Sequence, residues 1–219
     1  MEFDDAVISR RTCRDYKSKD LPMEILGQII DIARYAPSSA NVQNWQFIVV
    51  VNPDKREKLS DICSEQSWMA DAPVHLIVCN RKQEVIAKFP SKGEKFASQN
   101  CAIIATHIML KANDLGVGSA WVGAFDEELI RRELDIPDEV IPECIITLGY
   151  PNELEEDQPR EGLKFITSLE KWGGKEIKKE FFPLSKHIER FNKKTVQASN
   201  RAKTNLSGSL RRLKDKIKN

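Results

Sequence analysis

The sequence predicts an α+β or α/β fold in which helices pack on a β-sheet, and three observations lead to this fold class. Helical and strand-like hydrophobic patterns alternate along residues 1–150. The hydrophobic fraction of 41% is ordinary for a globular protein. The length of 219 residues suits one domain with a sizeable core, or one such domain with an appendage.

Five helices are predicted from apolar residues at helical spacing and from residues that begin or end helices. Pro22 and Pro53 suit the first position of a helix, and Asp126 suits an N-cap. Pro37 ends the second helix because a residue before proline avoids helical geometry, and Gly116 suits the C-cap of the longest helix. In order, the predicted helices cover residues 3–11, 22–36, 53–63, 95–115 and 126–134.

Four strands are predicted from short apolar runs rich in β-branched and aromatic residues. They cover residues 45–51, 74–79, 119–122 and 141–149. The order is therefore helix, helix, strand, helix, strand, long helix, strand, helix, strand, and it contains no internal repeat. A sheet with helices packed on it satisfies this order.

Charge divides the chain into two chemically different parts. Residues 1–172 have a net charge of −9, from 20 Lys and Arg against 29 Asp and Glu. Residues 173–219 have a net charge of +10, from 14 basic against 4 acidic residues. The last fifth of the chain is therefore chemically different from the rest.

Cysteine and histidine usage disfavours a disulfide framework and a metal site. The five cysteines are an odd number, widely scattered and without a CxxC pair, and the three histidines are scattered too. The N-terminus has no apolar run of signal-peptide length, and no stretch approaches the ~20 apolar residues that span a bilayer. We expect an intracellular, cytoplasmic protein without a metal.

A basic cluster, Arg10-Arg11-Thr12-Cys13-Arg14, follows the first predicted helix. Three guanidinium groups and a hydroxyl within five residues can converge on one phosphate through charge-assisted bonds. The alternative interpretation, a solvated basic turn, has about equal weight from these residues alone.

A polar loop, Pro37-Ser38-Ser39-Ala40-Asn41-Val42-Gln43, precedes the first predicted strand. Its hydroxyl and carboxamide groups offer the donors and acceptors that a polar heterocycle such as a flavin pyrimidine ring requires. Loops at strand ends commonly form ligand sites, but an ordinary turn is the simpler interpretation of this composition.

Small residues surround an aromatic one in Gly116-Val117-Gly118-Ser119-Ala120-Trp121-Val122-Gly123-Ala124-Phe125. Such a stretch lets a flat ring lie close to the backbone. It lacks the third glycine of the dinucleotide fingerprint and follows a helix, so a Rossmann site is not indicated. The alternative is a helix C-cap followed by a buried strand.

Taken together and in this order, the motifs resemble those of the nitroreductase family of FMN-dependent oxidoreductases. The resemblance has four ordered pieces, at residues 8–16, 36–47, 115–125 and 148–151, the last being Leu148-Gly149-Tyr150-Pro151. It covers roughly residues 1–165 and so implies an FMN-binding domain over 1–165, followed by a basic helical C-terminal extension over 166–219. It implies an α+β fold with a central, mostly antiparallel sheet flanked by helices, in an intertwined homodimer with FMN at the interface.

The resemblance also implies which residues bind the phosphate and ribityl chain of FMN. Arg10, Arg11 and Arg14 would hold them, with the Thr12 hydroxyl where the family usually has serine. A basic residue after the Gly-Tyr-Pro motif normally contacts the phosphate, and Arg160 is the best candidate.

Other residues would contact the flavin ring or reach the flavin from the partner subunit. Gln66 would approach the ring system, and the isoalloxazine would be lined by Trp121, Val122 and Gly123. The residues implied to come from the partner subunit are Pro37, Ser38, Ser39 and Asn41.

The implied reaction passes a hydride from NADH or NADPH to flavin N5 and then electrons to a small acceptor, by ping-pong kinetics. The acceptor would be a quinone, a nitroaromatic or a free flavin, and no catalytic acid or base is nominated. Two other classes stay open: a flavin-binding module without turnover, and a nucleic-acid or membrane protein that binds through the basic tail.

Three features depart from the family pattern. Asn44 stands where many members have proline before the tryptophan, and residues 79–95 are short and polar, without the apolar lid helix of some members. The basic tail has no counterpart. The tail could be a flexible basic end, an amphipathic contact for a membrane or nucleic acid, or helices that lie on the acidic core. Its apolar residues favour the helices over 175–195, with a more weakly held helix over 196–219.

Overall fold

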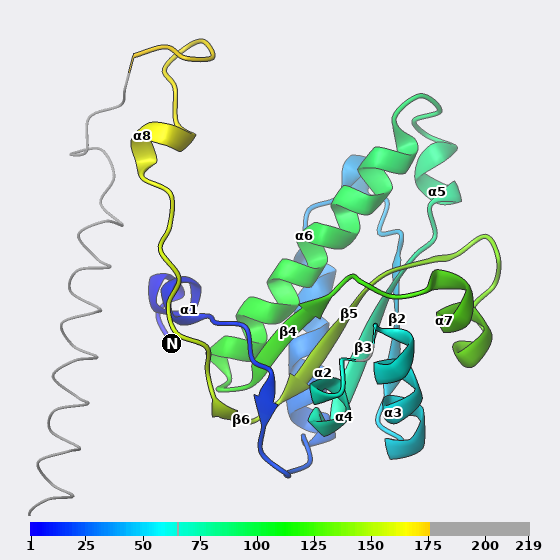
Figure 1. The fold of residues 1–219 in the computed structure, drawn as a ribbon. Coiled ribbons are helices and arrows are strands. Elements are labelled where there is room, and N and C mark those ends of the chain that lie inside the picture. Colours follow the sequence, from blue (N-terminus) through cyan, green and yellow to red (C-terminus); the bar gives the residue numbers. More distant parts are fainter. Residues whose placement is uncertain (65, 176–219) are drawn as a thin grey trace, which may run out of the picture. The chain divides into compact units, whose positions relative to one another are not determined.

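A computed structural model describes residues 1–64 and 66–175 of the chain (Figure 1). It divides the chain into two units, each of which is considered by itself. The first unit consists of Met1 and residues 9–157 and holds the sheet with its helices. The described part of the second unit consists of residues 2–8 and 158–175.

A four-stranded antiparallel sheet forms the centre of the first unit. β3 and β5 are its inner strands and are buried almost throughout, because both faces of the sheet are covered. Ile77 of β3 lies opposite Ile48 on one side and Ile145 on the other. In spatial order the strands are β2 (Trp45–Val50), β3 (Val74–Asn80), β5 (Ile141–Gly149) and β4 (Gly118–Val122).

Helices α2 (Met23–Asp31) and α6 (Gly93–Asp114) pack on one face of this sheet (Figure 1). Fully buried side chains from both helices and from the strands meet there, including Leu26, Ile29, Leu76, Ile104, Ile108 and Ile146. Burying each such side chain stabilises the fold by ~1.5–3 kcal/mol, so this layer is a principal source of stability.

Helices α3 (Pro53–Ile62), α4 (Trp68–Asp71) and α7 (Glu127–Leu134) pack on the opposite face. Asn52 caps α3 by accepting from the Lys55 N–H, and Asp126 caps α7 by accepting from the N–H groups of Glu128 and Leu129. Both caps satisfy main-chain donors that have no partner within their helix. The side chains that fill this second core cluster include Leu59, Met69, Ile77, Ile130 and Ile145.

A small second sheet joins the N-terminal segment to the stretch that follows β5. In it, β1 (Asp15–Tyr16) pairs antiparallel with β6 (Pro151–Glu153). The buried Tyr16 hydroxyl lies 2.7 Å from the Cys13 carbonyl oxygen and 2.7 Å from Thr147 Oγ1. Gly149 has to be glycine here, since a Cβ would lie 2.5 Å from Pro73 Cδ and 2.8 Å from the Tyr16 ring.

The predicted α+β fold with a mostly antiparallel sheet is confirmed, and every predicted helix and strand is present. The second helix differs in its last turn. It is α-helical to Asp31 and then tightens into a 3₁₀ helix, η1 (Ile32–Tyr35), before an extended Ala36 with ψ 136°. The extended residue before Pro37 is the expected effect of the proline ring. The expected homodimer stays a prediction.

Several short elements escaped prediction because two to four residues show no hydrophobic period. They are β1, α4, α5 (Gln83–Ile86), β6, α8 (Leu163–Ile166) and the 3₁₀ turn η2 (Ser39–Asn41). α5 lies in the region 79–95, where no apolar lid helix was expected. It buries Val85, and Phe89 and Phe96 after it stack edge to face with ring centres 5.2 Å apart.

The described part of the second unit contains α8 and most of α1 (Phe3–Ser9). Apart from Lys175, the tail helices expected over 175–195 and 196–219 lie outside the described residues. Over the part of the chain that is described, no helix combines the length and apolarity needed to cross a membrane.

His75 is a buried histidine in the middle of the sheet. Its Nε2 lies 2.8 Å from the Met69 carbonyl oxygen, which can only accept, so Nε2 carries the proton. Its Nδ1 is buried without a hydrogen-bond partner among the described residues. Burial, followed by the charge of Arg56, lowers the pKa of His75 to about 4. The ring is therefore neutral in the folded protein at neutral pH.

We expect His75 to make the fold less stable in mild acid. Between pH ~6.5 and about 4, His75 is protonated in the unfolded chain but stays neutral in the folded one. The free energy of unfolding therefore falls as the pH falls, by at most ~1.4 kcal/mol per pH unit. His75→Gln should be less stable than wild type at pH 7, but its free energy of unfolding should depend less steeply on pH. Urea unfolding at several pH values measures this free energy for both proteins. A pH dependence in the His75 variant as steep as that of wild type would contradict the prediction.

Candidate functional site

The basic cluster, residues 10–14, lies along the edge strand β4. Thr12 forms a parallel bridge with Ser119, and the Cys13 N–H donates to the Ser119 carbonyl oxygen at 3.0 Å. The Cys13 side chain is fully buried, and Gly118 gives it room, because a Cβ at 118 would lie 2.7 Å from Cys13 Sγ. The structure thus brings the first and third sequence motifs together.

A cavity of about 240 Å³ lies at this junction. Two arginines, two serines and an asparagine belong to its walls, and this chemistry suits an anion with further hydrogen-bonding groups. Its lining residues are Met1, Ser9, Arg10, Arg11, Asn113, Gly116, Val117, Gly118, Ser119, Pro151 and Leu154.

Carboxylates from the stretch after β6 pair with the arginines of the basic cluster. Arg11 Nη2 lies 2.9 Å from Asp157 Oδ1, and its Nη1 donates to the Arg10 carbonyl oxygen at 2.9 Å. Arg14 pairs with Glu155 and also lies over the ring of Trp68, with its guanidinium carbon 5.6 Å from the ring centre. The pairing of β1 with β6 brings these residues together.

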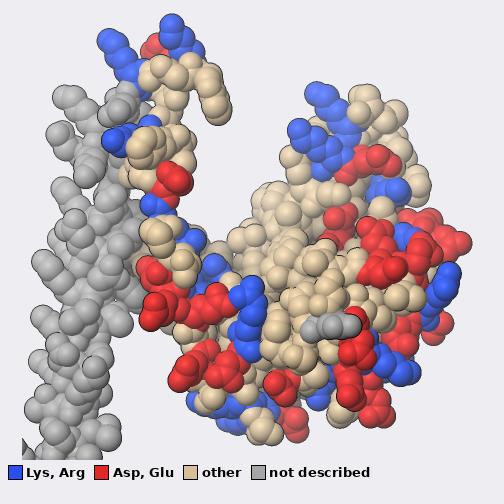
Figure 2. Space-filling view, in the orientation of Figure 1, with Lys and Arg blue, Asp and Glu red and all other residues tan. Residues whose placement is uncertain are grey.

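These ion pairs lie at the surface of a unit rich in acidic side chains, as Figure 2 shows for the visible face. The Arg11 side chain is 16% exposed and that of Arg14 is 49% exposed. A carboxylate offers two oxygens to a guanidinium in much the same geometry as a phosphate does. The basic cluster is therefore arranged to bind oxygen anions.

Trp121 presents an exposed aromatic surface on a strand that is otherwise buried. It is 41% exposed, whereas Val122 is buried in the core beneath α3 and α7. Gly123 lies against the indole, because a Cβ there would be 3.2 Å from Trp121 Nε1. Trp121 and Gly123 can therefore line a flat ligand, and Val122 can do so only through its main chain.

The polar loop, residues 37–43, is attached to the N-terminal half of α6. Asn100 Oδ1 accepts from the Ser39 N–H at 3.1 Å and from Ser39 Oγ at 3.2 Å. Ala40 and Asn41 have positive φ values of 50° and 59°, so the loop makes a left-handed turn. Ser38 Oγ is buried and has no hydrogen-bond partner within the described chain.

Within one chain the polar loop lies far from the cavity at the basic cluster. Asn100 holds the loop and Asn113 lines the cavity, and both residues belong to the same helix, α6. Thirteen residues of helix separate them by roughly 20 Å. The structure therefore does not bring the second motif to the first and third within one chain.

The two remaining candidate residues lie elsewhere. Gln66 precedes α4, two positions before Trp68, and its Nε2 donates to the Cys63 carbonyl oxygen at 2.8 Å. It is thus on the same short segment as the ring that contacts Arg14. Arg160 belongs to the second unit, and its expected contact with the phosphate stays a prediction.

Sequence reasoning missed several residues that shape the site. Glu155 and Asp157 pair with the arginines, and no motif identified them. Asn100 could have been found, because it lies three residues after Ala97 and four before Ile104, on the apolar stripe of the long helix. A carboxamide at such a position must have a buried polar partner.

Comparisons with known proteins agree on one family. The model of the nitroreductase family matches residues 7–68 and 63–150 of this chain. A Methanothermobacter thermautotrophicus protein, provisionally named an NADH dehydrogenase/NAD(P)H nitroreductase, is 36% identical over 157 residues, covering 70% of this chain and 79% of that protein. An FMN reductase (NADPH) of Bacillus subtilis is 25% identical over 170 residues, covering 71% of this chain and 68% of the enzyme.

Solved structures give the same result. An FMN-dependent nitroreductase of Clostridium difficile is 28% identical, with a TM-score of 0.62, covering 70% of this chain and 90% of that one. A nitroreductase family protein of Streptococcus pneumoniae, 23% identical over 76% of this chain and 99% of its own, shares the fold with a TM-score of 0.71. The family model covers well over half of the chain, and the chain belongs to the nitroreductase family of oxidoreductases.

Proposed function

We propose that this chain is an FMN-dependent oxidoreductase that passes electrons from NADH or NADPH to a small acceptor such as a nitroaromatic, a quinone or a flavin. The observation that carries this proposal is the attachment of the basic cluster to β4, the strand that also carries the exposed ring of Trp121. Phosphate-binding groups and a flat aromatic surface thus occur on one sheet edge. Relatives named FMN reductase and FMN-dependent nitroreductase support the same cofactor.

The donor groups of this chain fit FMN. Arg10, Arg11 and Arg14, with the Thr12 hydroxyl, supply the charge and hydrogen bonds that a phosphate and a ribityl chain require. Ser38 Oγ is a buried polar atom without a partner in the described structure, as expected for a group whose partner is a ligand. When bound, FMN would supply the hydride and electron transfer itself.

The two buried ionisable side chains beside the basic cluster, Cys13 and Tyr16, stay neutral. Burial raises the pKa of the Cys13 thiol and of the Tyr16 phenol, so both stay protonated. The Tyr16 proton is directed to the Cys13 carbonyl oxygen, away from any ligand. The residues around the basic cluster therefore act through fixed charge and shape, and no general acid or base is assigned.

A second copy of the chain is part of this proposal. The polar loop and the cavity at the basic cluster are held about 20 Å apart by α6, and bending this helix would break its hydrogen bonds. A two-fold partner can bring its own polar loop to the cavity of the first chain, since an isologous contact exchanges the same surfaces. We infer a homodimer with two flavin sites at the interface, each composed of both chains.

The absorption spectrum and the affinity for FMN test the cofactor. The purified protein should be yellow and should bleach anaerobically with NADH or NADPH, whereas a flavin-storage module would stay yellow. Arg14→Ala removes one or two charge-assisted bonds of ~1.5–3 kcal/mol each, so the Kd for FMN should rise at least tenfold. The exposed Arg34→Ala, which removes an ion pair to Asp31 on α2, is the matched control. An unchanged Kd in the Arg14 variant would contradict the assignment of Arg14 to the FMN phosphate.

Glu155 competes with the flavin phosphate for Arg14 in this proposal. Glu155→Gln should therefore tighten FMN binding, by at most about fivefold, because an exposed ion pair contributes ~0.2–1 kcal/mol. The effect should disappear at high salt, since salt screens such pairs. Glu156→Gln removes the same charge from the neighbouring position and should have a smaller effect. Weaker binding in the Glu155 variant would instead show that the carboxylate positions Arg14 for the cofactor.

Mixing two defective chains tests the shared site. Arg14→Ala and Ser39→Trp each disable one half of every site, so a heterodimer of the two retains one site with both halves intact. Random exchange should then restore about a quarter of wild-type activity at limiting FMN, while each variant alone stays inactive. Subunit exchange is verified with tagged chains. No recovery despite exchange would mean that each site is formed by a single chain.

A further inference from the structure

Three asparagines are buried side by side where β2 begins, where β3 ends and on α6. Asn44, Asn80 and Asn100 are each at most 1% exposed. Asn100 Nδ2 donates to Asn44 Oδ1 at 2.7 Å, and Asn44 Nδ2 donates to Asn80 Oδ1 at 2.6 Å. We call these three residues the asparagine relay. None of the three is among the proposed flavin contacts.

Main-chain groups fix the orientation of each carboxamide at the Ser39 end. Asn100 Oδ1 faces the Ser39 N–H, which can only donate, and its Nδ2 also faces the Val42 carbonyl oxygen at 3.4 Å, which can only accept. Asn44 Nδ2 likewise lies 3.3 Å from the Ala97 carbonyl oxygen. Neither amide can be flipped without losing these bonds, so the direction of donation is determined.

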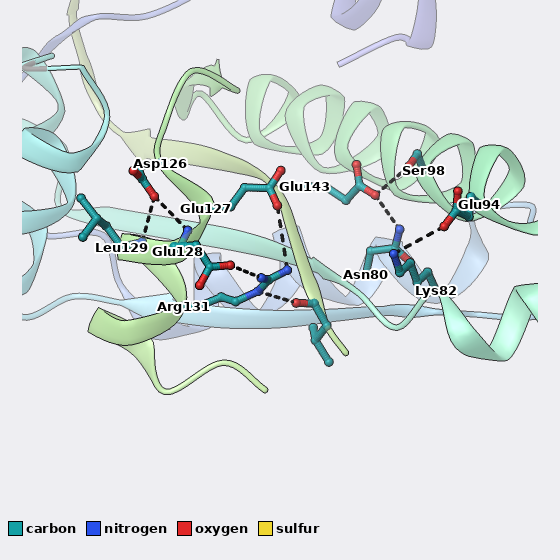
Figure 3. A network of polar contacts seen from close by, with 11 residues as sticks. Asn80, Lys82, Glu94, Ser98, Asp126, Glu127, Glu128, Leu129, Arg131 and Glu143 are labelled. Carbon is teal, nitrogen blue, oxygen red and sulfur yellow. Dashed lines mark hydrogen bonds and ion pairs between the residues drawn. The ribbon is translucent and has the colours of Figure 1, made fainter. Parts of the chain in front are cut away.

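The relay ends at a carboxylate. Asn80 Nδ2 donates to Glu143 Oε1 at 2.5 Å, and Ser98 Oγ donates to the same oxygen at 2.7 Å. Figure 3 shows the Asn80 and Ser98 side chains pointing to Glu143 from two sides. Every donor from Ser39 onward therefore points toward Glu143. Hydrogen bonds that donate in one direction polarise one another, and an anionic acceptor strengthens the chain.

At its other end, the relay determines whether the Ser39 hydroxyl donates or accepts a hydrogen bond. Asn100 Oδ1 has no hydrogen to give, so Ser39 Oγ, 3.2 Å away, must donate its proton inward. The lone pairs of Ser39 Oγ are then left for a ligand, toward which the hydroxyl is an acceptor only. Ser38 Oγ beside it has no partner in the described chain and can serve as donor or acceptor.

We propose that Asn100, held in orientation by the relay to Glu143, is a positioning residue that presents Ser39 Oγ as a hydrogen-bond acceptor to an N–H or O–H group of the bound flavin. The proposal rests on the proposed function, because the polar loop is a flavin contact only there. It assigns a role to a residue that lies beneath the site. This arrangement also determines which ligand group can bind at Ser39. An N–H or O–H group can donate to Ser39 Oγ, whereas a carbonyl oxygen finds no donor there.

A double-mutant cycle on FMN affinity tests this role. Ser39→Ala and Asn100→Ala should each raise the Kd for FMN about fivefold, the usual effect of one hydrogen bond. The double variant should stay near fivefold, because Asn100 acts through Ser39. Gln99→Ala, an exposed change at the adjacent position of α6, is the matched control and should leave the Kd unchanged. Additive effects near 25-fold, or no effect of Asn100→Ala, would overturn the proposal.

Two further measurements keep the test decisive. Amide hydrogen exchange of Ser39 in the flavin-free protein should accelerate in Asn100→Ala and not in Gln99→Ala, and unchanged exchange would overturn the positioning role. If Asn100→Ala does not fold, Asn44→Ser in the next link gives the same cycle. FMN methylated at the imide nitrogen identifies the donor. If Ser39→Ala no longer raises the Kd for this analogue, the donor is the ring N–H, and if it still raises the Kd, the donor is on the ribityl chain.

The outcomes for this role and for the proposed function are distinguishable. If the wild-type protein does not bind FMN, the proposed function fails, and the flavin contact of Ser39 fails with it. If the wild-type protein binds FMN but Ser39 and Asn100 contribute independently, only the positioning role fails.

Discussion

The main-chain pairing of Thr12 and Cys13 with Ser119 is the interaction on which the rest of the candidate site depends. β4 is one of the two edge strands of the sheet, and an edge strand has main-chain groups that need partners. Residues 12 and 13 of the N-terminal segment supply these partners, and the buried Cys13 side chain packs against Gly118. One contact therefore pairs this sheet edge and places the basic cluster on the strand that carries the exposed Trp121.

The length of α6 imposes the second constraint. Its C-terminal end borders the cavity at the basic cluster through Asn113, and its N-terminal half holds the polar loop through Asn100. A straight helix packed on the sheet keeps these two parts of the chain apart. A ligand that contacts both would have to lie between two chains, and for this reason we propose a homodimer.

The sequence predicts the long elements of this fold well, because they repeat a hydrophobic period. It does not predict β1 or β6, which depend on pairing with each other across a long stretch of chain, or α4, which is only four residues long. The same limit applies to the site. Arg14 was found from its neighbours and from the family resemblance, but its contacts with Glu155 and Trp68 join segments that spacing alone cannot bring together.

The asparagine relay also explains how this chain accommodates Asn44 where many family members have proline. Burying one carboxamide without partners costs ~1–3 kcal/mol, so a lone asparagine at this position would destabilise the fold. Asn80 and Asn100 remove that cost by accepting from and donating to it. The three residues therefore form one unit: replacing any single one leaves a buried donor or acceptor unsatisfied, whereas an apolar replacement of all three could preserve the core. What an apolar core could not preserve is the acceptor that Asn100 offers to Ser39, and this bond ties the unit to the polar loop.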